Sequence, residues 1–321
     1  MAKNPSVIAS DDHGQSGRAA LRALVDGYLE AMIAHNPSAV PLASRVKYTE
    51  DTATIPVGDG LWVGASAGPT AFRIYALDAA SGQAGFFGIM QEFDKPVLLA
   101  LRLKTVAGQI VEIEHVVARR LPEPAMGNLI QPRPGFLQPV PPSLRAPRRE
   151  MLRIADSYFD SIEQCNGDVA PFADDSVRHE NGKQTTTNKP PDPATFGTSE
   201  SEKIRLGWAR IDALGVRDQM NCRNLSYITR IRPRRLVVID EEMGLVYGFP
   251  MFVHRGNVQK VQIVGVPGVD ALPMPFGPFN LQAGEIFKIS GGQIHEIEAN
   301  GCVLPYGSKS GWEEEYSDEI G

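Results

Sequence analysis

The chain has 321 residues, and its content of 22% charged and 42% hydrophobic residues is that of an ordinary globular protein. The net charge of -6 argues against a broad nucleic-acid-binding surface, which needs clustered lysine and arginine to replace phosphate counterions. The 3 cysteines lie far apart, which argues against a disulfide framework, and no apolar run reaches the roughly 18 residues of a membrane span. We therefore expect a cytoplasmic protein of two domains, with neither a nucleic-acid nor a membrane partner.

The N-terminal part of the chain predicts one helix followed by strands. Residues 1–16 are small and polar, and we expect a disordered tail. Apolar residues at helical spacing, including Leu21, Leu24 and Tyr28, predict an amphipathic helix that ends before Pro37. Alternating apolar and polar residues then predict strands at 46–51, 71–78, 85–93, 97–105 and 108–118. This order favours an α+β fold with an antiparallel sheet.

A proline-rich segment separates the two predicted domains. Residues 121–149 contain eight prolines, which remove backbone donors and disfavour regular elements. We interpret this segment as a linker between a first domain at 17–120 and a second at 150–315. Its apolar residues, such as Met126 and Phe136, are compatible with a linker that follows a protein surface, and a flexible linker is the alternative.

The second half repeats features of the first. The motif GQIVEIE at 108–114 returns as GQIHEIE at 292–298, with six of seven positions identical. Its alternation predicts a half-buried strand entered through a glycine turn. The helix residue Tyr28 aligns with Tyr158 at an offset of 130. The chain therefore looks internally duplicated, which must be settled before the fold is assigned.

The later parts of the two copies align with an insertion. With one inserted residue, Tyr48 meets His179 and Glu50 meets Asn181. At the closing motif the offset has grown to 184, so the second copy has gained about 53 residues in total (184 minus 131). Most of them lie within 182–235, where 201–214 has a helical pattern, and within 259–284. Insertions of this size usually cap or bind something.

The helix, the first strand and the closing hairpins resemble the SnoaL-like, nuclear-transport-factor-2-like cone. The hairpins read LRLKTVAGQIVEIEHVV (101–117) and EIFKISGGQIHEIEA (285–299). The second half resembles an uncharacterised SnoaL-like family in VRHENG (177–182), RRLVVIDEEMGLV (234–246) and LPYGSKSGW (304–312). The resemblance covers nearly the whole chain outside the tail and linker. It implies two fused cone-shaped α+β domains with curved antiparallel sheets, packed as a pseudo-dimer, each with an apolar pocket.

The resemblance also implies positions for catalytic residues. Ketosteroid isomerases of this fold carry a tyrosine on the first helix and an aspartate base on the first strand. Tyr28 and Tyr158 match the tyrosine, whereas Glu50, or Glu180 with Asn181, matches the base. The second oxyanion donor of these isomerases is an acid on the penultimate strand, which would fall at positions 100 and 284. It is missing from both, so ketosteroid isomerisation itself is in doubt while general base catalysis remains open.

Several further residues are candidates from their own chemistry. His179 and Glu180 face opposite sides of a strand, and we favour His179 as an inward-facing proton shuttle. His254 follows a strongly apolar strand, and Asp240 lies next to arginines that would set its pKa. Each candidate has a structural alternative: a core aromatic, a surface carboxylate, a structural histidine or a turn ion pair. The candidate catalytic residues are Tyr28, Glu50, Tyr158, His179, Glu180, Asp240 and His254. The candidate substrate-binding residues are Tyr48, Asn181, Trp208 and Tyr247.

We expect a lyase or isomerase that needs no cofactor and acts on a small apolar or aromatic metabolite by general acid–base chemistry. The second domain is the favoured active half. One alternative is an epoxide hydrolase, which needs an Asp-Arg-Asp or equivalent set in one pocket, and another is a non-catalytic binding or scaffold protein. No cysteine or histidine spacing indicates a metal site, and association into a homo-oligomer is left open.

Overall fold

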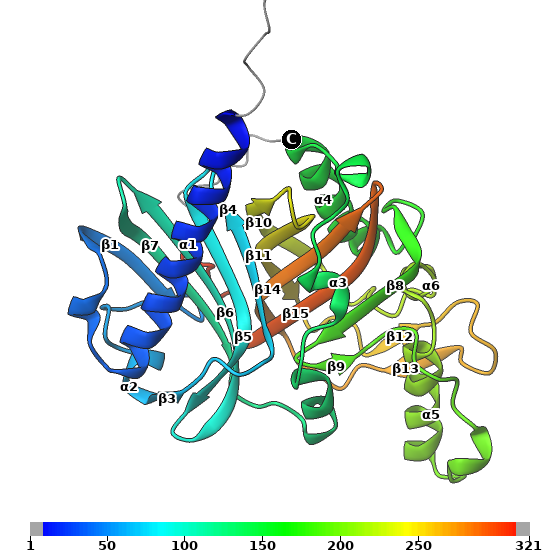
Figure 1. The fold of residues 1–321 in the computed structure, drawn as a ribbon. Coiled ribbons are helices and arrows are strands. Elements are labelled where there is room, and N and C mark those ends of the chain that lie inside the picture. The colour runs from blue at the N-terminus through cyan, green and yellow to red at the C-terminus, as the bar shows by residue number, and fades with distance from the viewer. Residues whose placement is uncertain (1–8, 313–321) are drawn as a thin grey trace, which may run out of the picture.

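The computed structural model describes residues 9–312, with side chains described from residue 17 onwards. Residues 1–8 of the predicted tail lie outside the described residues, and helix α1 (Ala9–Ile33) already begins at Ala9. The described chain combines helices with two curled sheets, an α+β fold as expected (Figure 1). No helix among the described residues is long and apolar enough to cross a membrane.

The first half is a seven-stranded sheet with α1 lying across it (Figure 1). Its strand order is β2-β1-β7-β6-β5-β3, and β4 also pairs with β5. A short helix, α2, precedes β3, and the turn η1 follows α1. The bounds are η1 (Pro37–Ala39), β1 (Leu42–Glu50), β2 (Ala53–Thr54), α2 (Leu61–Gly64), β3 (Ala65–Ala67), β4 (Arg73–Asp78), β5 (Gln83–Glu92), β6 (Lys95–Val106) and β7 (Gln109–Ala118).

The second half is a six-stranded sheet of the order β10-β11-β14-β15-β8-β9, with α4 packed on one face. The predicted insertions form a satellite of α5, α6 and the hairpin β12-β13, which has its own small core. The bounds are α4 (Arg148–Gln164), β8 (Phe172–Glu180), β9 (Lys183–Gln184), η4 (Pro193–Thr195), α5 (Glu200–Asp212), α6 (Val216–Asn221), β10 (Arg230–Asp240), β11 (Leu245–His254), β12 (Lys260–Gln262), β13 (Ala271–Pro273), β14 (Phe279–Ser290) and β15 (Gln293–Pro305).

The sheets are mixed, which corrects the prediction of antiparallel sheets. Most neighbours are antiparallel hairpins, but β1 pairs with β7 and β8 pairs with β15 in parallel. The closing strand of each half returns beside the first strand and runs in the same direction. Alternation in the sequence reports which face of a strand is buried, and it carries no information about which strand lies next to it.

The register of the parallel pairs also corrects the alignment of the two halves. Glu50 pairs with His115, and Glu180 pairs with Ala299. Positions 115 and 299 are the same place after the repeated motif, so Glu50 corresponds to Glu180, not to Asn181. The inserted residue assumed in the alignment is therefore absent, and the offset stays at 130 through this strand.

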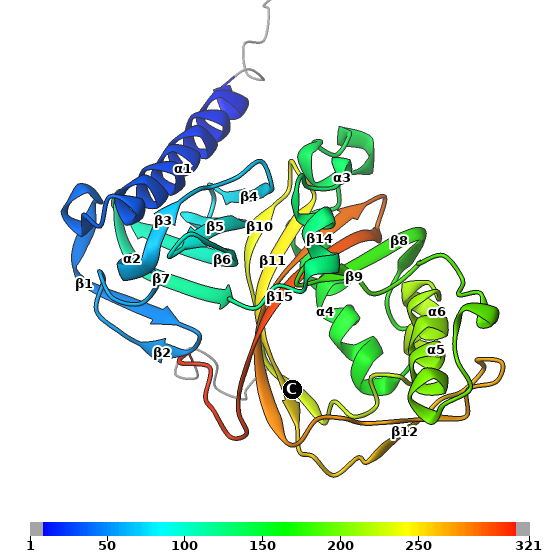
Figure 2. The same cartoon turned by 90° about the horizontal axis from the view of Figure 1, so that it is seen from below.

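The two sheets share an apolar cluster. Side chains of β4 to β7 meet side chains of β10, β11 and β14 in this cluster, and separate cores lie beneath α1 and α4. Figure 2 shows the sheets meeting in the middle of the molecule, with α1 and α4 on outer sides. Burial of apolar area at about 25 cal/mol per Å² drives this packing as it drives each core.

The proline-rich linker is packed along the protein. It contains η2 (Glu123–Leu129), α3 (Pro134–Leu137) and η3 (Pro142–Leu144), each with proline at its N-terminus. Proline is tolerated there because the first amides of a helix have no intrahelical acceptor, and this is why the predicted lack of regular elements was wrong. Phe136 is buried, and the Arg133 guanidinium donates to the carbonyls of Val177 and Ile297. The segment is therefore packed against the protein at these residues.

Candidate functional site

A cavity of about 130 Å³ lies in the second half, between α4, the second sheet and the loop at 222–229. Most of its wall is apolar, with carboxyl, hydroxyl and amide groups placed at a few points. This is the usual character of a small-molecule site. The lining residues are Tyr158, Ile162, Glu180, Asn181, Leu225, Tyr227, Ile228, Phe252, Phe279, Leu281, Ala283, Glu285, Ala299, Asn300 and Gly301.

Glu285 is the most unusual group in this cavity. Residues two apart on a strand share a face, so Glu285 follows Leu281 and Ala283 into the cavity. Its side chain is 3% exposed, and no hydrogen-bond partner of Oε2 is found among the described residues. Burial raises the pKa of this carboxyl to about 8, and the nearby Glu180 adds to the rise while Arg178 opposes it. At neutral pH Glu285 is therefore mainly a neutral acid that can donate a proton.

Arg178 organises the polar side of the cavity from β8. Its guanidinium pairs with Glu180 at 2.8 Å, donates to Gln219 at 2.6 Å and donates to the Tyr158 hydroxyl at 3.4 Å. Because that hydroxyl accepts from Arg178, its own proton is free to point elsewhere. Burial raises the pKa of Tyr158 well above its usual range, so the hydroxyl stays protonated. The site thus holds two donors, Tyr158 and Glu285, and one carboxylate, Glu180.

Two asparagines join the cavity floor to neighbouring strands. Asn181 accepts from the Gly301 amide at 2.9 Å and donates to the Gly301 carbonyl at 3.4 Å. Asn300 donates to the backbone of the first half, at Leu98 (3.0 Å) and Val116 (2.8 Å). The position of β15, which carries part of the wall, therefore depends on the packing of both halves.

The structure brings three predicted residues together at this cavity: Tyr158, Glu180 and Asn181. His179, favoured as the proton shuttle, lies on the opposite face of β8, with Nδ1 at 3.7 Å from Glu298 Oε2. Burial and the charge of Arg133 lower the pKa of His179 to about 4. Alternation along the strand sends the two neighbours to opposite faces. Glu180 takes the face that lines the cavity, with a side chain that is 48% exposed, whereas His179 is buried on the other face.

His254 lies behind the cavity wall and does not line it. Its Nδ1 is 2.8 Å from the Tyr227 carbonyl oxygen, and its ring packs against Tyr227 and Phe279, which do line the cavity. No hydrogen-bond partner of its Nε2 is found among the described residues. His254 is therefore placed to support the wall, and the prediction of a catalytic histidine at the mouth is not met.

Asp240, Tyr247 and Trp208 serve packing elsewhere. Asp240 accepts from the Leu77 amide at 2.9 Å and pairs with Arg18, which ties the second half to the first. Tyr247 is buried between the two sheets and donates to a backbone carbonyl of β5 at 3.2 Å. Trp208 packs on the core of the satellite. None of the three lines the cavity, which corrects their prediction as catalytic or substrate-binding residues. The contacts of each side chain come from elements distant in the sequence, and the sequence pattern does not report them.

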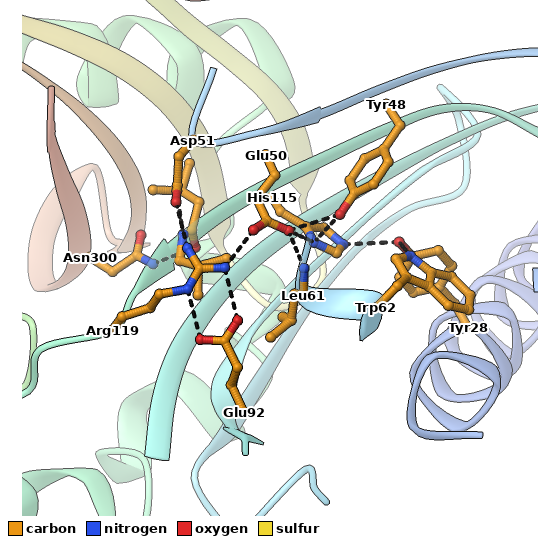
Figure 3. A network of polar contacts seen from close by, with 12 residues as sticks. Tyr28, Tyr48, Glu50, Asp51, Leu61, Trp62, Glu92, His115, Arg119 and Asn300 are labelled. Carbon is orange, nitrogen blue, oxygen red and sulfur yellow. Dashed lines mark hydrogen bonds and ion pairs between the residues drawn. The ribbon is translucent and has the colours of Figure 1, made fainter. Parts of the chain in front are cut away.

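The predicted residues of the first half form a closed polar network (Figure 3). His115 lies between two tyrosines, with Nε2 at 2.9 Å from the Tyr28 hydroxyl and Nδ1 at 3.1 Å from the Tyr48 hydroxyl. Tyr48 donates to Glu50 at 2.9 Å, and the Trp62 indole donates to the Tyr28 hydroxyl at 2.9 Å. Every one of these five side chains is buried. Their polar atoms are thus used within the protein.

Glu50 is held as a charged residue inside this network. Its burial would raise its pKa, but hydrogen bonds from His115, the Leu61 amide and Arg119 lower the pKa to about 2. The Trp62 ring packs edge-on against Tyr28, with ring centroids 5.2 Å apart. Helix α2 thus places an indole on the hydroxyl whose counterpart, Tyr158, lines the cavity in the second half. The arrangement in the first half is suited to stability.

Sequence reasoning missed Glu285 and Arg178. The expected acid on the penultimate strand was sought at Gly284, but a Cβ there would lie 2.4 Å from Ala100 in the other half. The acid stands at the next position, on the opposite face, and it is the only acidic residue of its strand. That single acid in an apolar strand was a usable signal. Arg178 was hidden by the one-residue error in the alignment.

Among the described residues, no group of three or more histidine, cysteine or acidic side chains is placed to hold a metal ion. A family model described as a domain of unknown function (DUF8021) matches residues 144–301. This span contains every residue that lines the cavity. No curated protein matches the chain at a significant level.

Proposed function

We propose that the second half is a lyase or isomerase that uses general acid–base chemistry, without a cofactor, on a small apolar or aromatic carbonyl compound. The observation that carries the proposal is Glu285, a buried carboxyl without a partner for Oε2 in a mostly apolar cavity. Burying a carboxyl that lacks a hydrogen-bond partner costs free energy, and strongly shifted pKa values cluster at functional sites.

In the proposed reaction, Glu180 is the base. It takes a proton from the carbon next to the carbonyl, and the electron pair moves onto the carbonyl oxygen. Glu285 and Tyr158 donate hydrogen bonds to that oxygen as its charge develops, which is worth most in a water-poor site. Glu180 then returns the proton to another carbon, completing isomerisation, or to a departing hydroxyl, completing elimination of water. Arg178 positions Glu180 and Tyr158 without touching the substrate.

The size of the cavity limits the reacting part of the substrate. A cavity of about 150 Å³ holds benzene, and this cavity measures about 130 Å³. One six-membered ring or a branched chain of similar volume is therefore the largest head group that fits without rearrangement.

We also propose that the two halves are a tandem pair of SnoaL-like cone domains. The two sheets support this proposal because they share one strand arrangement. In each, a short hairpin is followed by a parallel pair and then by antiparallel strands, in the orders β2-β1-β7-β6-β5 and β9-β8-β15-β14-β11. The first half would then be a structural partner, because its tyrosines and Glu50 are bonded to protein groups.

A second candidate, an epoxide hydrolase, is favoured by one observation. The charge of Arg178 acts on both Glu180 and Glu285, which supplies a carboxylate-arginine-carboxyl set in one cavity. Glu180 would take a proton from water as the water oxygen attacks an epoxide carbon, and Glu285 would give its proton to the opening oxygen. Asp240, the predicted candidate beside arginines, lies at the contact between the halves and takes no part in this set.

The test is deuterium exchange. The purified protein is incubated in D₂O with cyclohexanone, cyclohexenone and acetophenone, and deuterium uptake is followed by mass spectrometry; cyclohexene oxide in the same assay reports diol formation. We expect exchange above the buffer rate, reduced about 100-fold or more by Glu285→Gln and by Glu180→Gln.

Glu298→Gln is the matched control. Glu298 is another buried carboxyl, but it pairs with Arg133 and does not line the cavity. Exchange at equal rates in the wild type and in Glu285→Gln overturns the proposal. Binding of these ketones without any exchange would instead support a non-catalytic binding protein.

A further inference from the structure

An apolar surface continues from the cavity to the outside of the protein. Val303 is 66% exposed and Phe276 is 58% exposed, although both are large apolar residues. Val303 pairs with Leu281 across β14 and β15, and directly opposed residues of an antiparallel pair share a face. Leu281 lines the cavity, so Val303 extends the same wall beyond the mouth.

The second edge of this surface is aromatic. Phe276 packs edge-on against Phe279, with ring centroids 6.1 Å apart, and Phe279 lines the cavity. We name Phe276, Phe279, Leu281 and Val303 the apolar ramp. The adjoining stretches, 279–283 and 299–305, contain no charged residue. Exposed apolar surface that is continuous with a pocket is typical of a binding site.

We propose that the apolar ramp binds a hydrocarbon tail, so that the ligand is an amphiphile with a one-ring or short polar head in the cavity and an alkyl or prenyl chain along Leu281 and Val303. The identity of the head as a carbonyl compound rests on the proposed function, whereas the tail site rests on the ramp alone. Two observations favour a ligand tail as the occupant. The ramp is continuous with the cavity, and the cavity is too small to hold a longer molecule by itself.

The experiment measures affinity against chain length. Cyclohexanones with 4-alkyl substituents from methyl to hexyl are titrated into the full-length protein by calorimetry. Burial of each methylene is expected to tighten binding by up to about fourfold. Val303→Asp should flatten this series and leave the affinity for unsubstituted cyclohexanone unchanged, because Val303 lies outside the cavity.

Val106→Asp is the matched control, because Val106 is a similarly exposed valine in the first half, 59% exposed. An affinity that is independent of chain length in the wild type, or parallel series in the wild type and Val303→Asp, overturns the tail site. Self-association that Val303→Asp removes, seen by analytical ultracentrifugation, assigns the ramp to a second copy of the chain and also overturns it.

The two proposals fail separately. Chain-length dependence without deuterium exchange keeps the tail site and removes the proposed chemistry. Exchange on unsubstituted cyclohexanone without chain-length dependence of binding keeps the proposed chemistry and removes the tail site.

Discussion

Replacement of Glu285 by glutamine should change how stability depends on pH. An acid whose pKa is raised on folding binds more protons in the folded state than in the unfolded state between the two pKa values. The stability that this acid contributes is fully present below its pKa in the unfolded state and is lost as pH rises through its pKa in the folded state. For Glu285 this window runs from 4.5 to about 8.

The size of the effect follows from the width of that window. At about 1.4 kcal/mol per pKa unit, the wild type loses at most about 5 kcal/mol of unfolding free energy that Glu285→Gln keeps. The variant should therefore gain stability relative to the wild type as pH rises from 5 to 9. Glu298 and His179 titrate in both proteins, so their contributions cancel in the difference.

Urea denaturation followed by tryptophan fluorescence at pH 5 and pH 9 measures this difference. A difference in unfolding free energy between the two proteins that is the same at both pH values would refute a raised pKa at Glu285. If the neutral acid is also the catalytic donor, the exchange rate of the wild type should fall as pH rises through about 8.

Four further substitutions test the roles of individual residues. Tyr158→Phe should lower the rate of ketone exchange about 100-fold with little change in melting temperature. Tyr28→Phe should leave exchange unchanged and lower the unfolding free energy by about 1 to 3 kcal/mol, because the buried Trp62 indole loses its acceptor. Equal effects of the two substitutions on exchange would contradict these roles. Asp240→Ala should cost about 3 kcal/mol in urea denaturation, since the Leu77 amide and Arg18 lose their partner, and a loss under 0.5 kcal/mol would show that the contact between halves does not depend on it. The pKa of His179 is lowered on folding from 6.5 to about 4. The wild type should therefore lose about 3 kcal/mol of unfolding free energy as pH falls through that window, while His179→Gln should not. An equal difference in stability between the two proteins at pH 4.5 and at pH 7.5 would speak against a buried neutral imidazole.

The two halves hold their matching tyrosine and carboxylate in different ways. In the first half, Trp62 and Leu61 bond the tyrosine and the carboxylate that the resemblance marked as catalytic. In the second half, the equivalent Tyr158 and Glu180 line a cavity beside Glu285. A closed half and an open half fit a division of labour in which the first stabilises the second through the shared apolar cluster.

The sequence by itself determined most of the helices and strands. Amphipathic spacing marked α1, alternation marked the strands, and the helical pattern at 201–214 matches α5 (Glu200–Asp212). The family resemblance also named Tyr158 and Glu180 as candidates, and both line the cavity. Motif positions along a chain can be compared without coordinates. These are features for which the residue and its immediate neighbours suffice.

Only the tertiary structure decided which of these residues share a site. Parallel pairing of β8 with β15 set the register that places Glu180 at the cavity and buries His179 on the other face, and a shift of one residue exchanges the two faces. Contact between the halves also decided the position of the acid on β14. A side chain at position 284 would clash with Ala100 of the other half, whereas Glu285 lies on the opposite face, at the cavity. Pairing partners and contacts between halves join residues more than a hundred positions apart, and no periodicity within a single strand reports them.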